Sequence, residues 1–186
     1  MKIIYFNFLQ VRSTNQLMKT IIHSLKTEAL TVLHALYQSE GKGTFGKSWL
    51  SSEKNLTTSF AFFLKIQELD NALLTTIGSR AICNLLEKEN IKNFRIKWPN
   101  DVMVNDKKIA GILCETIPIN EKLCIILGLG LNINAGIDFL NLIPQPATSL
   151  FQEIGKKHDI SKIKKTITKY IIKNVLQTFG HLTMWD

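Results

Sequence analysis

The sequence contains few of the features that define a disulfide scaffold, a zinc protein or a membrane protein. Its three cysteines, Cys83, Cys114 and Cys124, have neither the spacing of a zinc site nor that of a disulfide framework. No apolar run is long enough to cross a bilayer, and the apolar start at 2–9 is followed by no signal-peptide cleavage site. We therefore expect a soluble, cytoplasmic protein with no membrane association, whose cysteines stay thiols without a catalytic role.

Acidic residues are also scarce relative to basic ones. The chain has 15 Asp and Glu against 23 Lys and Arg, which gives a net charge of +8 and a pI near 9.4. Such a charge suits anionic ligands, acidic proteins or nucleic acid. Much of the surplus lies between 156 and 173, where we expect the lysines to form the solvated face of a helix. No zinc-finger or helix-turn-helix pattern is present, so the sequence predicts no DNA binding.

Hydrophobic periodicity predicts hairpin-connected strands with helices set apart from them. Strands are expected at 2–9, 29–38, 55–64, 91–97, 101–104, 108–117 and 122–131. Helices are expected from Ser13 or Thr14 to about 26, at 69–88 with Asn90 as C-cap, at 147–155 and at 160–179. The pattern predicts one α+β domain with a mixed, largely antiparallel sheet flanked by helices. If 108–117 and 121–131 pair about a turn near Ile119, Cys114 and Cys124 face each other.

The most unusual stretch is Lys97-Trp98-Pro99-Asn100-Asp101, which lies between two of these strands. Pro99 has no backbone donor and disfavours a helix at the residue before it, so we expect a rigid kink. Asn105-Asp106 is a turn signal that folds the chain back, which brings Lys108 near Asn100 and Asp101. Such a group suits a site that holds a phosphate and a carboxylate together. A surface hairpin with solvated lysines is the alternative for this stretch considered alone.

A glycine-rich loop, Gly41-Lys42-Gly43-Thr44-Phe45-Gly46-Lys47-Ser48, satisfies the P-loop pattern G-x-x-x-x-G-K-[ST]. A P-loop requires a strand before it and a helix after it, whose N-terminus binds the phosphates. The residues that follow, 49–54, are short and polar and lead into another strand, so we disfavour a P-loop NTPase. Free backbone amides and two lysines still suit a lid that orders over an anionic ligand.

Several motifs occur together and in an order that resembles the biotin protein ligase family. They are Ser13-Thr14-Asn15, Gln38 followed by Gly41–Trp49, Asn55-Leu56, Lys97–Asp101, Lys108–Leu113 with Glu115, and Gly128–Asn132. The matches cover about residues 5–135, and the run from Lys97 to Glu115 is the most specific. The resemblance implies the catalytic fold of biotin and lipoate protein ligases, similar to class II aminoacyl-tRNA synthetases, over residues 1–180.

The activity that this resemblance implies is ATP-dependent biotinylation through biotinyl-5'-AMP, with biotin, ATP and Mg²⁺ as the small molecules. The implied partner is the biotin carboxyl carrier protein of acetyl-CoA carboxylase, which receives biotin on one lysine. The catalytic residues implied are Lys108, Lys42 and Asp101. The implied biotin pocket contains Ser13, Thr14, Asn15, Gln38, Gly41, Lys42, Gly43, Lys108, Gly111 and Gly130. The implied nucleotide site contains Lys42, Thr44, Lys47, Trp49, Asn100, Asp101, Lys108 and Asn132, and no protein-only metal site is expected.

The glycine loop departs from the family pattern, which commonly reads G-R-G-R-x-G-R. Lys42 and Lys47 replace arginines, and Thr44 stands where an arginine that helps to retain the adenylate is usual. Lysine lacks the bidentate fork of arginine, so we predict looser retention of biotinyl-AMP than in an arginine-rich relative. We also expect that an N-terminal winged helix is absent and that the C-terminal SH3-like barrel is absent or truncated.

Other interpretations remain open from the sequence. A lipoate or octanoate protein ligase or transferase shares the superfamily but lacks the Lys-Trp-Pro-Asn-Asp signature. A P-loop NTPase would use ATP without biotin, and a non-catalytic remnant would bind biotin without releasing pyrophosphate. An edge strand of the sheet would support either a homodimer or docking of the carrier.

Overall fold

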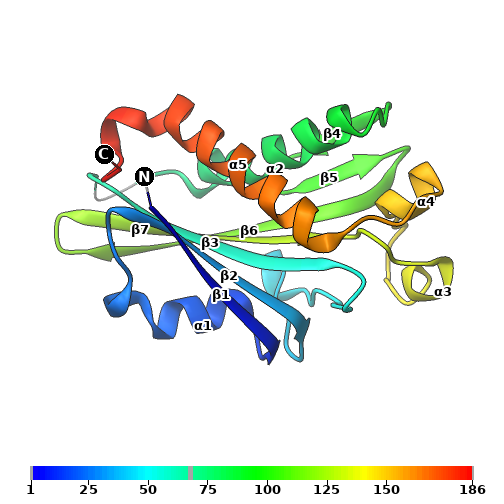
Figure 1. The fold of residues 1–186 in the computed structure, drawn as a ribbon, viewed down its shortest axis with the longest axis horizontal. Helices are drawn as coiled ribbons and strands as arrows, with labels where there is room; N and C mark the ends of the chain where they lie inside the picture. The colour runs from blue at the N-terminus through cyan, green and yellow to red at the C-terminus, as the bar shows by residue number, and fades with distance from the viewer. Residues whose placement is uncertain (1, 67–68, 186) are drawn as a thin grey trace.

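Strands rich in apolar residues build one mixed sheet in the computed structural model, which describes residues 2–66 and 69–185 (Figure 1). Within these residues seven strands occur in the order β1-β2-β3-β7-β6-β5-β4. They are β1 (Lys2–Val11), β2 (Ala29–Gln38), β3 (Leu56–Leu64), β4 (Phe94–Lys97), β5 (Asp101–Val104), β6 (Lys107–Ile119) and β7 (Lys122–Leu131). β1 and β2 are parallel, and the other neighbours are antiparallel. The predicted α+β class and mixed, largely antiparallel sheet are confirmed.

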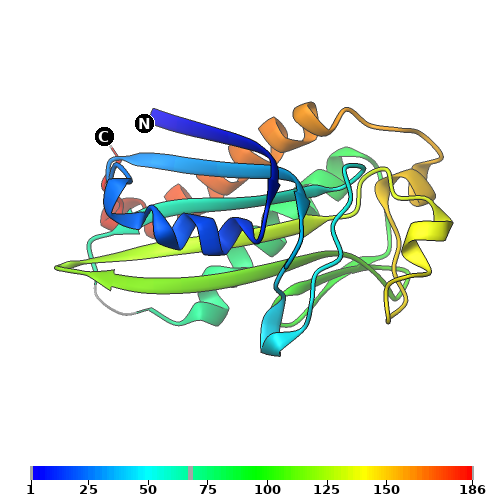
Figure 2. The ribbon, with the colours of Figure 1, turned by 90° about the horizontal axis from the view of Figure 1, so that it is seen from below.

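Helices cover both faces of this sheet. They are α1 (Thr14–Thr20), α2 (Asn71–Lys88), α3 (Ile137–Leu140), α4 (Leu150–Ile154) and α5 (Ile160–Phe179). α1 lies on one face, whereas α2 and α5 lie on the other (Figure 1, Figure 2). The larger core, which includes Phe60 and Ile125, lies under α2 and α5, and a smaller one with Met18 and Leu33 lies under α1. No helix in the described ranges has the length and apolar composition needed to span a membrane.

Several element bounds agree with the sequence signals, and the exceptions have local causes. The strands at 29–38, 101–104 and 122–131 and the helix at 160–179 have the predicted bounds. α1 ends at Thr20 instead of near 26, and a 3₁₀ turn at Ile22–Ser24 follows. Thr20, Ile21 and Ile22 are consecutive β-branched residues, which are poor helix formers. The short helix α3 was not predicted, and Asn90 lies one residue past the C-cap of α2, with a φ of 57°.

The two hairpin turns behave differently from each other. Asn105 and Asp106 both adopt positive φ, 45° and 61°, as a two-residue hairpin turn requires, so the predicted reversal is confirmed. The turn expected at 118–120 lies later, because β6 continues through Ile119 and Asn120 adopts the positive φ of 54°. Cys114 consequently pairs with Leu127 and does not face Cys124, which corrects the predicted juxtaposition. Burial raises the pKa of Cys114 to about 12, so it remains a thiol at neutral pH.

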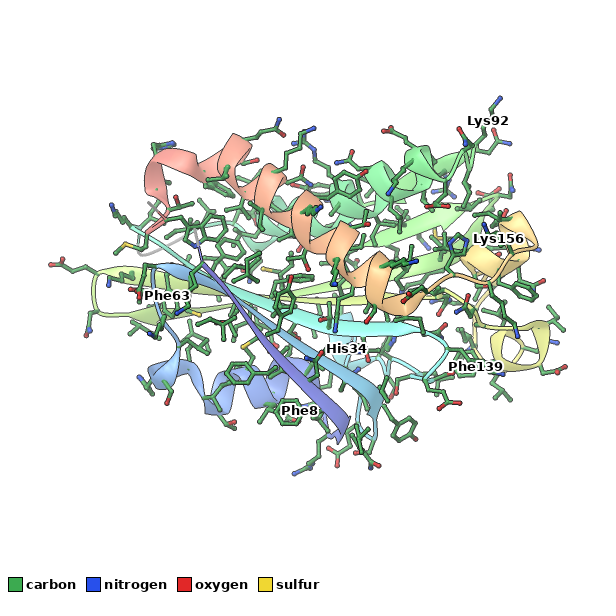
Figure 3. All side chains as sticks on the ribbon, viewed as in Figure 1. Phe8, His34, Phe63, Lys92, Phe139 and Lys156 are labelled. Carbon is green, nitrogen blue, oxygen red and sulfur yellow. The ribbon has the colours of Figure 1, made fainter. Side chains whose placement is uncertain are left out.

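One lysine of α5 departs from the predicted solvated face. Lys164 is buried, and its Nζ donates a hydrogen bond of 2.6 Å to Oδ1 of Asn7 on β1. His34 on β2 lies on the same side of the sheet, beneath α5 (Figure 3). The aliphatic part of the Lys164 side chain covers apolar surface, while its ammonium hydrogen-bonds to the neutral side-chain amide of Asn7. This contact ties the C-terminal helix to the edge strand β1.

The buried His34 predicts a loss of stability at mildly acidic pH. Burial lowers the pKa of His34 below 6.5, and the charge of Lys164 acts in the same direction, although a hydrogen bond to the carbonyl of Thr57 opposes both. The unfolded chain therefore binds more protons than the folded chain as pH falls through 6.5 and the lower folded-state pKa. Urea denaturation of the wild type at pH 7.5 and 5.5 should show lower stability at 5.5. His34→Gln should show a smaller pH effect, and an equal effect in both proteins would refute this assignment.

Candidate active site

A cavity of about 640 Å³ opens at the end of the sheet where β1 and β2 finish and β6 begins. Its size is typical of a small-molecule site. Nearly all the residues that the sequence analysis singled out line it, although they come from six separate segments. Those on the wall are Ser13, Thr14, Asn15, Gln38, Lys42, Gly43, Thr44, Lys47, Trp49, Asn100, Asp101, Lys108, Gly111, Gly130 and Asn132. Gly41 lies just behind the wall, where its carbonyl accepts a hydrogen bond from the amide of Trp49.

Lys108 and Asp101 form the charged centre of this cavity. Lys108 Nζ lies 2.7 Å from Asp101 Oδ1, and both side chains are about one-sixth exposed. The register between β5 and β6 shifts so that Ile109 is an extra residue on β6, and such bulges change the direction of neighbouring side chains. Lys108 lies opposite Met103 of β5, and its backbone N–H and C=O bond to Pro146 and Thr148. The predicted proximity of Lys108 to Asp101 is therefore confirmed, and both its backbone and its side chain are held in place.

Two facing glycines form a flat platform for the indole of Trp49. Gly111 on β6 pairs with Gly130 on β7. A Cβ atom on Gly130 would lie 2.2 Å from Cε2 of Trp49, and one on Gly111 would lie 3.2 Å from its Cζ3. The ammonium of Lys108 lies 5.7 Å from the centroid of the same ring, within range of a cation–π interaction. The indole Nε1 is buried and has no hydrogen-bond partner among the described residues.

The glycine loop forms a small hairpin over the cavity and is not a P-loop. Lys42 pairs with Ser48, the amide of Gly43 donates to the carbonyl of Lys47, and a 3₁₀ turn occupies Thr44–Gly46. No helix follows the loop in the described chain, which continues through an irregular segment into β3. The phosphate-binding helix N-terminus that a P-loop needs is therefore missing. The P-loop alternative from the sequence is wrong.

The tip of this loop is tied to the kink before β5. Asn100 Nδ2 donates to Oγ1 of Thr44 at 3.2 Å and to Oδ1 of Asp101 at 3.0 Å. The kink itself contains a cis peptide bond between Trp98 and Pro99. Since Asp101 also accepts the ion pair from Lys108, a continuous polar chain links the loop to the central cation.

The opposite end of the cavity is polar and held by hydrogen bonds. Gln38 Oε1 accepts from the backbone N–H and the hydroxyl of Thr14, at 2.7 and 3.0 Å. Ser13 caps α1, and Ser59 on β3 lies within hydrogen-bond distance of both Thr14 and Asn15. These groups are buried, so a ligand that reaches them must offer donors and acceptors of its own.

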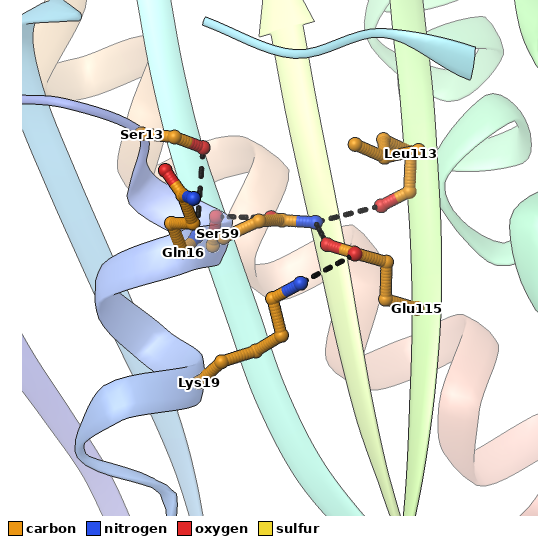
Figure 4. Close-up of polar contacts among 7 residues, drawn as sticks. Ser13, Gln16, Lys19, Ser59, Leu113 and Glu115 are labelled. Carbon is orange, nitrogen blue, oxygen red and sulfur yellow. Dashed lines mark hydrogen bonds and ion pairs between the residues drawn. The ribbon is translucent and has the colours of Figure 1, made fainter. Parts of the chain in front are cut away.

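Asn15 is positioned by the ion pair between Lys19 of α1 and Glu115 of β6, both of which are labelled in Figure 4. Its Nδ2 donates to Oε2 of Glu115 at 2.8 Å, and Lys19 Nζ contacts the other carboxylate oxygen at the same distance. Gly128 makes this possible, because a Cβ atom there would lie 2.4 Å from Asn15 Oδ1. The side chain of Asn15 is thereby engaged within the protein and forms part of a rigid wall.

Asn132 also lines the cavity, and its side chain connects two neighbouring segments by hydrogen bonds. Its Nδ2 donates to the carbonyl of Thr148 at 3.0 Å, and its Oδ1 accepts from Asn55 at 3.2 Å. Asn55 Oδ1 in turn accepts from the amide of Ile133. The sequence analysis placed Asn132 at the nucleotide, and the geometry shows that both polar groups of its side chain hold neighbouring segments together.

Some lining residues were not predicted from the sequence. A loop wall of Leu142–Gln145 and Ala147 closes one side of the cavity. Ser59, Lys19 and Glu115 support the polar end, although Glu115 was only noted as part of a motif without a role. Ser59 sits in an apolar, threonine-rich strand, where no local signal separates it from its neighbours. The loop wall becomes recognisable only through the backbone bonds that Pro146 and Thr148 make with Lys108.

The charge of the cavity favours an anionic ligand. Three lysines line it, Lys42, Lys47 and Lys108, whereas Asp101 is the one acidic residue among its described lining residues. Within 2–66 and 69–185 there is no cluster of three or more His, Cys, Asp or Glu side chains that would hold a metal ion. A cation-rich wall at one end and hydrogen-bonding groups at the other suit an elongated molecule with an anionic end.

Fold and site together define an α+β domain with a cavity for a small anionic ligand, built on paired glycines and a buried lysine–aspartate pair. Residues 7–132 match the model of the biotin/lipoate A/B protein ligase family. The chain belongs to this family.

The similarity to individual proteins agrees with this assignment. The chain is 33% identical over 132 residues to the bifunctional ligase/repressor BirA of Bacillus subtilis. The aligned region covers 69% of this chain and 41% of that protein. It is 32% identical over 125 residues to BirA of Escherichia coli, covering 66% of this chain and 38% of that protein. Among solved structures, the Aquifex aeolicus biotin protein ligase in complex with biotin and ATP matches with a TM-score of 0.75 and 30% identity, over 95% of this chain and 72% of that one.

Proposed function

We propose that this chain carries the catalytic domain of a biotin protein ligase. In the first step the biotin carboxylate attacks the α-phosphate of ATP, which forms biotinyl-5'-AMP and releases pyrophosphate. In the second step a lysine amine of an acceptor protein attacks the biotinyl carbonyl, the bond to the phosphate oxygen breaks, and AMP and a proton leave. The catalytic domain extends over residues 1–180 in this proposal, and the reaction takes place in the cytoplasm.

The observation that carries this proposal is the ion pair of Lys108 with Asp101 on the wall of the cavity. A carboxylate and a phosphate repel each other, and a fixed cation between them lowers that repulsion and stabilises the charge that develops during attack. Asp101 Oδ1, at 2.7 Å from Nζ of Lys108, and the backbone bonds to Pro146 and Thr148 hold Lys108 in position. Its ammonium therefore does not have to move when the reaction begins. Lys42 supplies a second cation from the glycine loop. No covalent enzyme intermediate is required by this geometry.

The polar end of the cavity favours biotin over lipoate or octanoate. Biotin carries a cyclic urea with two N–H donors and a carbonyl acceptor, whereas the lipoyl and octanoyl tails are apolar. Thr14 and Gln38 hydrogen-bond to each other, whereas Gln38 Nε2 and the Ser13 hydroxyl have no acceptor among the described residues and would stay without one beside an apolar tail. The Aquifex aeolicus relative, which holds biotin and ATP, supports the same choice.

The nucleotide would occupy the cationic end. Lys42 and Lys47 are available for phosphates, and the unpartnered Nε1 of Trp49 would donate to a ligand oxygen. Mg²⁺ fits as an ion that arrives with ATP, because it is commonly held by one or two carboxylates together with substrate phosphates. Asn100 and Lys108 both contact Oδ1 of Asp101, which leaves Oδ2 without a protein partner among the described residues. Asp101 would hold the ion, whose charge would neutralise the phosphates.

The acceptor in this proposal is the biotin carboxyl carrier protein of acetyl-CoA carboxylase. The net charge of +8 favours encounter with an acidic carrier surface through electrostatic steering. The apolar wall at Leu142–Pro144 and the glycine loop would keep water away from the reactive adenylate.

Biotin-dependent exchange of labelled pyrophosphate into ATP, without any carrier, tests this function. Exchange that requires biotin and is not supported by lipoate or octanoate is the expected result. Exchange with lipoate or octanoate in place of biotin would assign the chain to the other branch of the family. Tight biotin binding without exchange would identify a non-catalytic remnant.

Replacing Thr44 with arginine should slow the loss of biotinyl-AMP from the isolated protein by about tenfold, since hydrogen bonds to charged groups contribute about 1.5–3 kcal/mol. An arginine at the loop tip would present a bidentate fork to the phosphate, which threonine cannot do. Dissociation of radiolabelled biotinyl-AMP measures the effect, with Thr44→Met as the control of similar length without charge. Equal dissociation rates for wild type and Thr44→Arg would count against the predicted loose retention.

A further inference from the structure

A short segment, residues 146–148, is bonded directly to the backbone of Lys108. The carbonyl of Pro146 accepts a hydrogen bond of 2.9 Å from the amide of Lys108, and the amide of Thr148 donates one of 2.9 Å to the carbonyl of Lys108. Between them, Ala147 pairs with Lys108 as a parallel bridge and lines the cavity. This segment therefore restrains the main chain from which the ammonium of Lys108 projects.

Thr148 also restrains a second residue of the cavity wall. Its carbonyl accepts a hydrogen bond of 3.0 Å from Nδ2 of Asn132. Thr148 itself is 2% exposed and is not among the described residues that line the cavity. Its two backbone groups hold Lys108 and Asn132 at the same time, so a shift of Thr148 would displace both.

The side chain of Thr148 is held from outside the cavity by Glu153, which lies in α4. The hydroxyl of Thr148 donates a hydrogen bond to Oε1 of Glu153. The other carboxylate oxygen, Oε2, accepts a longer hydrogen bond of 3.4 Å from Nδ2 of Asn105, in the turn that leads into β6. Figure 1 shows α4 beside the end of the sheet where β6 begins. One carboxylate thus connects the turn before Lys108 with the segment that covers its backbone.

The start of α4 is anchored by groups other than the side chain of Glu153. The hydroxyl of Ser149 accepts a hydrogen bond of 3.2 Å from the amide of Gln152 and donates one of 2.7 Å to the carbonyl of Ala135. The amide of Leu150 donates to the carbonyl of Asn132. The helix is therefore capped and tied to the sheet independently of Glu153, and the carboxylate acts chiefly on Thr148.

Glu153 faces a second cavity, of about 400 Å³, which it shares with Glu89 and Asn105. No described residue lines both cavities, so a ligand in the first cavity is separated from Glu153 by Thr148. Any effect of Glu153 on the reaction must therefore pass through the residues that it holds.

We propose that Glu153 is a positioning residue for the reaction at Lys108 and acts through Thr148. Its carboxylate restrains Thr148, and the backbone of Thr148 restrains Lys108, so that the ammonium keeps its place beside Asp101. Small displacements matter at such a centre, because an error of about 1 Å in a reacting geometry can lower a rate about 10²-fold. The inference rests on the proposed ligase function for the reaction that Glu153 affects.

Glu153→Ala should lower kcat for biotin-dependent pyrophosphate exchange by about tenfold and leave the KM for biotin within about twofold, since biotin does not reach Glu153. Glu153→Gln keeps an oxygen that accepts from the Thr148 hydroxyl, so it should retain at least about half of the wild-type kcat. Glu89→Ala removes a carboxylate from the same second cavity without any described contact to Thr148 and should leave kcat unchanged. Loss of activity in Glu153→Gln equal to that in Glu153→Ala would contradict the role of the hydrogen bond.

A second background separates positioning from a general structural role. In Lys108→Ala, the further change Glu153→Ala should cause no additional loss of exchange, because the residue that it positions is gone. An additional tenfold loss in that background, about the effect expected in the wild type, would overturn the proposal. Thermal denaturation verifies folding, and Thr148→Val, which deletes the same hydrogen bond from the other side, replaces Glu153→Ala if that variant does not fold.

Competitive acetylation with acetic anhydride, followed by mass spectrometry, tests the positioning without catalysis. Lys108 is about one-sixth exposed and paired with Asp101, whereas its neighbour Lys107 is exposed and serves as the internal reference. The ratio of labelling at Lys108 to labelling at Lys107 should rise about threefold in Glu153→Ala, because the segment around Lys108 opens more often, and stay unchanged in Glu153→Gln.

The two readouts keep the proposal distinct from the ligase function. With exchange present in the wild type, an unchanged kcat in Glu153→Ala would overturn the positioning role whatever the labelling ratio. Without exchange in the wild type, the ligase function fails and the labelling ratio decides alone. An equal ratio in the wild type and Glu153→Ala would then overturn the positioning role, and a raised ratio would support it.

Discussion

Lys108→Ala should lower the rate of biotin-dependent pyrophosphate exchange by about 10²–10³-fold, the usual effect of removing one preorganised group that stabilises developing charge. The variant loses the cation on the cavity wall that lies 2.7 Å from Oδ1 of Asp101. The loss should appear in kcat, because attack of the carboxylate on the phosphate is the step that the cation assists. Exchange kinetics at saturating biotin and ATP measure it.

Lys107→Ala is the matched control for this experiment. Lys107 is the exposed neighbour of Lys108 at the start of β6 and does not line the cavity. Its removal changes the net charge equally, so a general electrostatic effect would appear in both variants. An exchange rate in Lys108→Ala that matches Lys107→Ala would remove Lys108 from the catalytic group, and circular dichroism of both variants would verify that they remain folded.

Gly130→Ala should weaken biotin binding at least about tenfold and destabilise the protein by about 1–3 kcal/mol, the usual cost of overpacking. The added Cβ would lie 2.2 and 2.4 Å from Cε2 and Cζ2 of Trp49, distances that real contacts do not reach. The indole must therefore leave the glycine platform, which moves the wall shared by the biotin and nucleotide ends of the cavity. Calorimetric titration with biotin and thermal denaturation measure the two effects.

Two comparisons make the cause specific. Gly136→Ala adds the same methyl group where nothing lies within 4 Å of the new atom, so it should leave both quantities unchanged. In a Trp49→Leu background, Gly130→Ala should cost much less stability, because the colliding ring is gone. If Gly130→Ala destabilises both backgrounds equally, contact with Trp49 is not the reason for the glycine.

The short-range features of this fold were predictable because their causes are local. The apolar run of 29–38 and the lysine-rich helical pattern of 160–179 carry their own periodicity, and the structure reproduces their bounds. The turn at Asn105-Asp106 follows from the tolerance of these residues for positive φ. By contrast, α1 was expected to continue to about residue 26 but ends at Thr20. The β-branched residues that end it lie inside an apolar pattern that is otherwise typical of a helix.

The grouping of the site residues was anticipated by the motifs, whereas their functional geometry was not. The sequence indicated that Lys108 would return close to Asp101, and the ion pair confirms it. The bulge at Ile109, the support of Asn15 by Glu115 and Lys19, and the engagement of Asn132 by Asn55 and Thr148 involve partners far apart in the chain. Such partners carry no local signal, because their proximity results from sheet register and packing.

Residue chemistry and local periodicity were thus sufficient for the class of fold and for the turn that returns Lys108, whereas the membership of the site followed from the resemblance of the motifs to a known family. The tertiary structure decided that Trp49 rests on the Gly111–Gly130 platform and that Lys164 is buried against Asn7. The physical reason is that these features depend on which strands become neighbours. Neighbour choice reflects burial and backbone pairing summed over the whole sheet, and no single segment encodes it.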